Sequence, residues 1–154
     1  MNRIALFEQL LDEKHHTTMM HEHYLNTIRE YAPGTNLYMR EMHFLMAADP
    51  GQPVSITDLA RKLEVTLGAA SQMAKKLEKK GLVVRCPDPE DRRRTMVSMT
   101  EEGICLYREH LEYDRKSLEA MSDLFRSFSD EEVKRLIEAE RLFQKGLCGT
   151  IRVS

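Results

Sequence analysis

Side chains suited to contacting nucleic acid gather in one stretch of the chain, residues 55–103. Between about Thr66 and Lys80, apolar residues recur at helical spacing and predict one core-facing stripe: Ala70, Met73 and Leu77. The positions between them are small or polar: Gly68, Ala69, Ser71, Gln72, Lys75, Lys76 and Lys79. Small residues allow close approach to a DNA groove, serine and glutamine can hydrogen-bond base edges, and lysines can neutralise phosphates. The alternative interpretation is an ordinary amphipathic helix with a solvated lysine face.

The residues before this helix predict a second, shorter helix and a tight turn. Its apolar positions keep a helical spacing: Ile56, Leu59, Ala60 and Leu63. Ser55 and Thr57 are candidates for its N-cap, and Thr66 is the candidate for the N-cap of the helix that follows. Gly81 is expected to stop the helix over residues 66–80, because the residue just past a helix often needs a positive φ. Helix, turn and helix therefore follow one another directly.

A β-hairpin with a basic loop is predicted next. Residues 82–85 and 95–99 have strand character and flank the turn-rich residues 87–91. The loop ends in Arg92, Arg93 and Arg94, and adjacent arginines suit a narrow minor groove, where negative potential is concentrated. Asp91 precedes Arg93 by two positions, and we expect its carboxylate to hold that guanidinium by a bidentate pair.

Charge is distributed unevenly along the chain. The whole sequence carries a net charge of −2, which gives no general attraction for DNA. Residues 55–94, however, contain ten lysines and arginines against six acids, a net charge of +4. The positive field is therefore local and coincides with the predicted helix-turn-helix and hairpin.

Helices are predicted on both sides of this stretch. The first is expected over residues 4–31, ended by Ala32-Pro33-Gly34, and the second over residues 36–48, ended by the turn-rich residues 49–53. Thr100 is the candidate N-cap of a long helix that reaches about residue 125. Ser129 and Glu132 form a capping box for a last helix, whose end we expect to fray over residues 146–154.

Several classes of protein are disfavoured by the sequence. It contains no phosphate-binding loop, no nucleophile elbow, no zinc-protease motif and no dinucleotide fingerprint, so we expect neither an enzyme nor a cofactor. Cys86, Cys105 and Cys148 form neither a disulfide framework nor a zinc-binding pair of cysteines. We find no signal peptide and no membrane-spanning run, so a cytoplasmic location with no membrane partner is expected.

The run from Val65 to Gly103 resembles the winged helix-turn-helix of the MarR family of bacterial transcription regulators. The resemblance rests on the D-x-R of the wing, on the hydrophobic and glycine positions around it and on the start of the next helix: Asp91, Arg93, Leu77, Gly81, Arg85 and Thr100-Glu101-Glu102-Gly103. These motifs cover about the middle third of the chain, and the helical ends extend the similarity to nearly all of it.

The resemblance implies a mostly α fold with a small β-hairpin wing, in one domain over residues 1–154. Residues 36–99 would form the winged helix-turn-helix lobe, and residues 1–35 and 100–154 the helices of a dimerisation lobe. A two-fold dimer places its recognition helices one DNA turn apart, ~34–36 Å. A monomer with a self-closed helical bundle is the alternative.

The preferred interpretation is a homodimeric repressor that binds a palindromic operator in double-stranded DNA. The residues expected at the DNA are Thr66, Gly68, Ala69, Ser71, Gln72, Lys75, Lys76, Lys79, Asp91, Arg92, Arg93 and Arg94. The alternative is a winged-helix module that docks proteins and binds no DNA. The three wing arginines favour DNA, since a protein-docking module would have little use for them.

The resemblance often implies an effector, and three alternatives stay open: an aromatic or amphipathic small molecule in a Met/Tyr-lined cleft, a metal, or no effector at all. One class of the family senses zinc, and His43, His110 and Asp114 lie where that class has ligands, with His23 or Glu22 as a fourth. Met42 and Asp114 depart from the pattern of that class. Cys86, on a wing strand, is expected to be a half-buried structural thiol, and its oxidation beside the DNA is the alternative.

Overall fold

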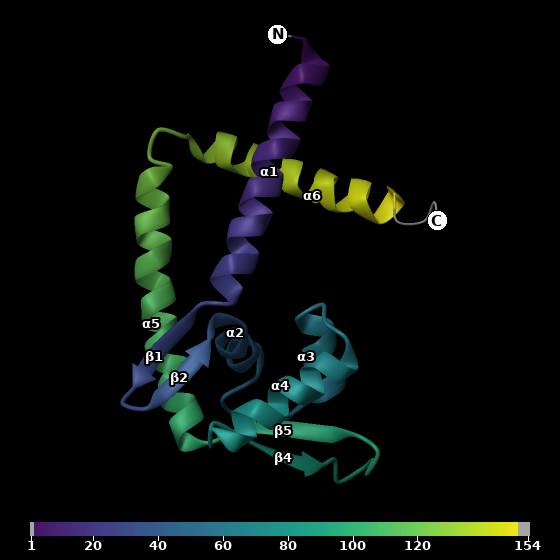
Figure 1. Ribbon diagram of the computed structural model, residues 1–154, viewed down its shortest axis with the longest axis vertical. Coiled ribbons are helices and arrows are strands. Elements are labelled where there is room, and N and C mark those ends of the chain that lie inside the picture. Colours follow the sequence, from purple (N-terminus) through teal and green to yellow (C-terminus); the bar gives the residue numbers. More distant parts are fainter. Residues whose placement is uncertain (1, 151–154) are drawn as a thin grey trace. The chain divides into compact units, whose positions relative to one another are not determined.

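The computed structural model describes residues 2–150, and the side chains of residues 2–146. Its helices are α1 (Arg3–Leu25), α2 (Met39–Ala47), α3 (Ile56–Lys62), α4 (Leu67–Lys79), α5 (Glu101–Leu124) and α6 (Asp130–Thr150) (Figure 1). Its strands are β1 (Ile28–Ala32), β2 (Thr35–Tyr38), β3 (Val54–Ser55), β4 (Val83–Pro87) and β5 (Thr95–Met99). The predicted mostly α fold with a small hairpin wing is confirmed. The chain divides into two compact units between His110 and Leu111, and α5 runs through that boundary.

The first part of the chain differs from the prediction. Instead of one helix over residues 4–31, α1 ends at Leu25, and β1 and β2 form an antiparallel hairpin with Arg29 opposite Leu37. Pro33 and Gly34 make the turn of this hairpin, and Gly34 has a φ of 80°, a conformation that glycine adopts without strain. The turn residues that predicted the end of a helix therefore reverse the chain direction between two antiparallel strands. The second helix, predicted from residue 36, consequently begins only at Met39.

The helix-turn-helix and the sheet share one buried core. It is made of Leu37, Met42, Phe44, Leu45, Ile56, Leu59, Ala70, Ala74, Leu77, Leu82, Val83 and Val97, among others. Ala70 and Leu77 of the predicted stripe are fully buried, whereas Met73 is half-buried. Ala74, which the prediction did not include, joins the buried face. Two alanines on this face let the backbone of α4 lie close to its neighbours, so the opposite face of the helix is held at the surface.

The wing is a three-stranded antiparallel sheet in the order β3-β5-β4. Val97 of β5 lies opposite Val54 on one side and Arg85 on the other, so the predicted β4–β5 hairpin is confirmed. β3 was not predicted, because a strand of two residues is too short to show any alternation in the sequence. It attaches the chain before α3 to the wing.

The end of α4 is a Schellman turn that returns the chain into the wing. Gly81, at a φ of 74°, donates its amide to the carbonyl of Glu78 at 2.9 Å, and Leu82 donates to the carbonyl of Leu77 at 3.0 Å. Thr100 then reaches back to the same turn, where its amide donates to the Leu82 carbonyl at 3.1 Å. Its hydroxyl also donates to the Gly81 carbonyl at 2.7 Å. The end of α4, the start of β4 and the start of α5 thus meet at one joint.

An ion pair between a buried carboxylate and a partly exposed lysine fixes the end of α4. Glu41 of α2 is 3% exposed, and its carboxylate accepts from Lys80 Nζ at 2.7 Å and from the Tyr38 amide at 2.9 Å. Lys80 Nζ also donates to the carbonyl of Asn36 at 2.8 Å. A buried carboxylate needs such partners to offset its desolvation. The end of α4 is therefore tied to the segment that joins β2 and α2.

The second unit contains the later part of α5 and α6. As predicted, Ser129 and Glu132 form a capping box at the start of α6, with the Ser129 amide donating to the Glu132 carboxylate at 2.8 Å. Exposed apolar side chains are frequent here: Leu118, Met121, Leu124, Phe125, Phe128, Val133, Leu136, Ile137 and Leu142. In the first unit, α1 has no buried residue and exposes Ile4, Leu6, Phe7, Leu10 and Leu11. None of the described helices has an apolar stretch long enough to cross a membrane.

The joint predicts the effect of adding a methyl group at Gly103, in the first turn of α5. A Cβ at this position would overlap the carbonyl oxygen of Leu82, which is backbone and cannot rotate away. Gly103→Ala is therefore expected to lower the free energy of unfolding by ~1–3 kcal/mol in urea denaturation. Gly68→Ala is the matched control, because that helical glycine has nothing within 4 Å of an added Cβ. The control should keep or raise stability, and equal stability of the two variants would contradict the packing described here.

Candidate nucleic-acid interface

The candidate surface for contacting DNA is the exposed side of α4. Thr66 caps the helix, and its hydroxyl accepts the amide of Ala69 at 3.2 Å, so this candidate has a structural role in starting α4. The other candidates on α4 lie on its surface, with Ser71 half-buried and the rest exposed: Gly68, Ala69, Gln72, Lys75, Lys76 and Lys79. Small residues occupy the first turn and lysines the last turns, where the carbonyl end of the helix dipole favours positive charge.

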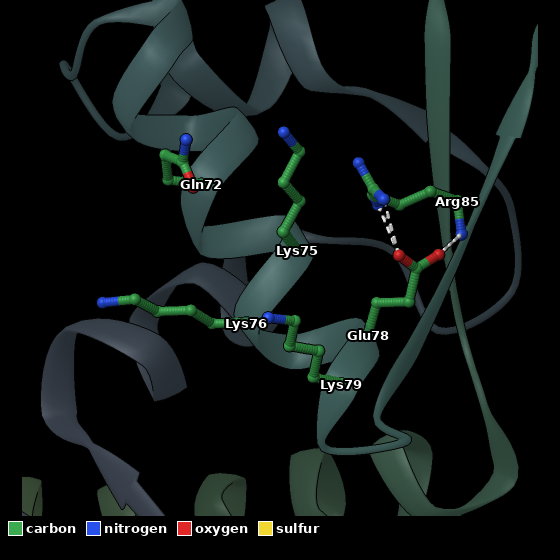
Figure 2. A pocket seen from close by; sticks show the side chains of 6 residues that line it. All are labelled: Gln72, Lys75, Lys76, Glu78, Lys79 and Arg85. Carbon is green, nitrogen blue, oxygen red and sulfur yellow. Dashed lines mark hydrogen bonds and ion pairs between the residues drawn. The ribbon is translucent and has the colours of Figure 1, made fainter.

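A hollow of about 320 Å³ lies beside α4 and faces the wing. It is lined by Gln72, Lys75, Lys76, Glu78, Lys79 and Arg85, of which all but the last belong to α4 (Figure 2). Figure 2 shows Arg85 reaching from β4 toward the carboxylate of Glu78. Four of these six side chains are cations, so the hollow is suited to an anionic group.

Glu78 and Arg85 join α4 to the wing through three polar contacts. One carboxylate oxygen accepts from Arg85 Nε at 2.8 Å and lies 2.6 Å from a terminal guanidinium nitrogen, while the other accepts the Arg85 backbone amide at 3.1 Å. The side-chain hydrogen bond from Arg85 lowers the pKa of Glu78 from its ordinary value, and the backbone hydrogen bond acts in the same direction. The carboxylate is therefore ionised in the pH range where proteins act.

The sequence analysis did not identify this pair as part of the interface. Glu78 and Arg85 are seven positions apart, on different elements, and only the Schellman turn at Gly81 brings β4 back alongside the last turn of α4. Opposite charges three positions before and four positions after a predicted helix-stop glycine are the signal that could have revealed the pair.

The wing loop is organised differently from the prediction. Asp91 does not hold the guanidinium of Arg93. Its carboxylate accepts the Arg93 backbone amide at 3.0 Å, and its carbonyl accepts the Arg94 amide at 2.8 Å. Backbone amides two and three positions ahead are within closer reach than a long side chain, which is why aspartate so often closes a turn in this way. Asp91 therefore shapes the loop, and the Arg93 side chain is exposed and available to a ligand.

The three wing arginines are not equivalent. All three are exposed, but Arg94 also lies 3.7 Å from a carboxylate oxygen of Asp58 on α3 and 3.6 Å from one of Asp88. The hydroxyl of Ser55, which donates to Asp58 at 2.6 Å, lowers the pKa of that carboxyl, and the charges of Arg61 and Arg94 add to the effect. Arg94 thus connects the wing to the helix-turn-helix.

The residues proposed for zinc are not assembled into a metal site. His110 is 1% exposed, and its Nδ1 lies 3.3 Å from the hydroxyl of Tyr31, while Glu22 pairs with Arg40 at 3.6 Å. The ring of His43 contacts Tyr24. Over the part of the chain that the structure describes, no three His, Cys, Asp or Glu side chains gather in a way that could hold a metal ion. A Met/Tyr-lined effector cleft remains a prediction.

The cysteines also differ from expectation. Cys86 is exposed on β4 and is not half-buried as predicted, because the strand's buried positions lie at its beginning. Cys105 is exposed on α5. Cys148 lies beyond the last side chain that the structure describes.

Comparison with known proteins identifies the family of this interface. The sequence profile of the MarR family matches residues 37–95. An uncharacterized HTH-type transcriptional regulator of Bacillus subtilis, YdgJ, is 31% identical over 105 residues, which are 68% of this chain and 62% of that protein. The chain thus spans about three fifths of the length of the curated relatives that it matches.

Solved structures share the fold. The zinc-responsive MarR family member ZitR of Lactococcus lactis superposes with a TM-score of 0.71 at 22% identity, covering 92% of this chain and 99% of that one. FabT of Streptococcus pneumoniae, solved in complex with DNA, gives a TM-score of 0.67 at 21% identity, covering 97% of this chain and 99% of that one.

The cap of α4 provides a test of how the interface is positioned. Thr66→Ala removes the hydroxyl that accepts the Ala69 amide, and it is expected to lower the free energy of unfolding by ~1 kcal/mol. Thr66→Ser keeps the hydroxyl and should remain close to wild type. Thermal and urea unfolding, followed by circular dichroism, measure both. An alanine variant as stable as the serine variant would show that Thr66 does not cap the helix.

Proposed function

Because the chain belongs to the MarR family, we propose that it is a homodimeric transcriptional regulator that binds double-stranded DNA at a palindromic site, most simply as a repressor. The observation that carries this proposal is the exposed face of α4, where small residues and Gln72 precede three lysines. The curated relatives are themselves HTH-type transcriptional regulators.

We assign base reading to the first half of α4 and backbone contact to the second. Gly68 and Ala69 are exposed and small, so the helix can approach the floor of a major groove, and the amide of Gln72 can pair with the edge of an adenine. Lys75, Lys76 and Lys79 then face the phosphates. In the wing, Arg92 and Arg93 are placed to enter the neighbouring minor groove.

Dimerisation is supported by apolar surface that neither compact unit covers. Ile4 on α1 is 70% exposed, Leu118 on α5 is 71% exposed and Leu142 on α6 is 62% exposed. Such runs of exposed apolar side chains mark interaction surfaces in soluble proteins. A second copy of the chain satisfies this need and places two recognition helices one DNA turn apart. We propose that residues 1–35 and 100–154 form the dimerisation lobe and residues 36–99 the DNA-binding lobe.

The proposal includes a cytoplasmic location, no catalytic activity and control by an effector, either a small molecule or a metal, that shifts the equilibrium between two spacings of the DNA-binding lobes. A winged-helix module that docks proteins is the competing function. It predicts that a selection from random DNA returns no enriched motif.

Arg93→Ala tests the wing. The Arg93 side chain is exposed, and Asp91 does not bind its guanidinium, so we expect Arg93 to contact DNA in the minor groove. Its replacement by alanine should weaken binding of selected operator DNA by ~1–3 kcal/mol. Fluorescence anisotropy at matched salt measures the affinity, and circular dichroism checks the fold. Equal affinities of variant and wild type would remove the wing from the interface.

Lysine and glutamine variants separate phosphate contact from base reading. Lys75→Ala and Lys76→Ala should each weaken binding to operator DNA and to random DNA about equally. Each should also lower the dependence of log affinity on log salt concentration (the salt slope of binding) by about one. Gln72→Ala should instead relax the base preference at one symmetric pair of operator positions. Lys134→Ala on α6, outside the winged helix-turn-helix, is the control and should leave both quantities unchanged. A Gln72→Ala motif identical to that of wild type would exclude Gln72 from base reading.

A further inference from the structure

An acidic residue lines the basic hollow beside α4, at the edge next to the wing (Figure 2). Glu78 is the single acid among the residues that line it, and the cations among them are Lys75, Lys76, Lys79 and Arg85. On a surface that meets DNA, a carboxylate repels the phosphates and lowers the local positive potential. Glu78 is 35% exposed in its side chain, so this repulsion is not removed by burial. We therefore expect Glu78 to have a favourable effect on DNA binding that offsets this repulsion.

The polar contacts of the Glu78 carboxylate all go to one residue, Arg85. Its carboxylate binds Arg85 Nε at 2.8 Å, a terminal guanidinium nitrogen at 2.6 Å and the Arg85 backbone amide at 3.1 Å. The side chain and the backbone of Arg85 are therefore fixed together relative to α4. An arginine left to itself loses considerable rotamer freedom when it binds a ligand, whereas one held in advance loses less.

This geometry leaves a second edge of the guanidinium for a ligand. Arginine has five N–H donors, and a side-on pair with a carboxylate uses the one on Nε and one on a terminal nitrogen. The remaining donors include a planar fork with one N–H from each terminal nitrogen, the shape that binds two oxygens of a phosphate. Arg85 lines the hollow together with Lys75 and Lys79, so a group bound there would meet several donors at once (Figure 2).

We propose that Glu78 is a positioning residue of the DNA interface, which orients Arg85 so that the outer edge of its guanidinium binds a backbone phosphate of DNA in the hollow beside Lys75. The inference rests on the proposed function and deepens it, because it adds Arg85 as a phosphate contact and gives an acid a favourable role in DNA binding. The phosphate contact fixes the wing and α4 on the duplex in one register.

The direction in which one substitution changes the DNA affinity distinguishes a positioning role of Glu78 from a purely electrostatic one. Glu78→Gln removes a negative charge from a DNA-facing surface, so electrostatics alone would strengthen binding and raise the salt slope. Positioning requires the opposite result: a roughly tenfold loss of operator affinity and a salt slope lower by about one, because the phosphate contact of Arg85 is lost. The glutamine carbonyl can still accept the Arg85 amide, so the local fold is retained. Anisotropy of the full chain on selected operator DNA measures both quantities.

Glu90→Gln is the matched control. Glu90 lies on the wing loop and is exposed, and its substitution removes the same charge without disturbing an arginine. Its affinity should stay equal to that of wild type or rise slightly. A loss of affinity common to both variants would overturn the proposal, because it would show an effect of lost negative charge that does not act through Arg85.

Variants of Arg85 complete the test. Arg85→Gln should weaken binding about as much as Glu78→Gln, and the double variant should bind no more weakly than Arg85→Gln alone, because both changes remove one contact. Arg85→Lys keeps the charge but lacks the planar fork, and it should also lose roughly tenfold in affinity. If circular dichroism and thermal unfolding show that Glu78→Gln does not fold, the affinity of Arg85→Lys tests whether the planar guanidinium of Arg85 contacts DNA.

Each outcome bears on a definite claim. Non-additive losses in Glu78→Gln and Arg85→Gln, with folded variants, support the proposal. Unchanged or tighter binding by Glu78→Gln, additive losses in the double variant, or wild-type affinity in Arg85→Lys would each overturn it while the proposed function stands. If the wild-type chain binds no DNA from a random pool, the proposed function fails and this inference fails with it.

Discussion

The return of the chain at Gly81 and Leu82 is the constraint on which the rest of the DNA-binding unit depends. Carbonyl groups at the end of α4 accept the amides of these two residues, and Thr100 then binds both of their carbonyls. The first turn of α5 lies so close that only a glycine fits at position 103. One set of backbone hydrogen bonds therefore sets the exit of the recognition helix, the entry of the wing and the start of α5, so these elements cannot shift independently.

The charged surface follows from this joint. Because β4 returns alongside α4, Arg85 reaches Glu78 and lines one basic hollow together with the lysines of α4. On the opposite side, Glu41 and Lys80 tie the end of α4 to α2. The recognition helix is thus braced by ion pairs on two sides and by its buried alanines beneath. A chain with a net charge of −2 can then present a basic surface, since Glu41, Asp58, Glu78 and Asp88 are held in internal ion pairs.

Features that depend on neighbouring residues could be predicted from the sequence. The caps at Thr66 and Ser129 and the stop at Gly81 each depend on local backbone chemistry, and all three are confirmed. The β1–β2 hairpin was missed because apolar spacing continues past Leu25 and a proline–glycine pair suits a helix stop as well as a strand turn. Contacts between elements were the least predictable: Asp91 binds an amide where a guanidinium was expected, and Glu78–Arg85 becomes visible only once the Schellman turn is known.

The central claim is that two copies of this chain present α4 and the wing to one face of a DNA duplex. Hydroxyl-radical footprinting of the full chain on its selected operator tests this most directly. Two protected blocks related by a two-fold axis are expected, with centres one helical turn apart at ~34–36 Å and flanking protection in the minor groove from the wings. A single protected block, or cleavage identical to that of free DNA, would contradict it.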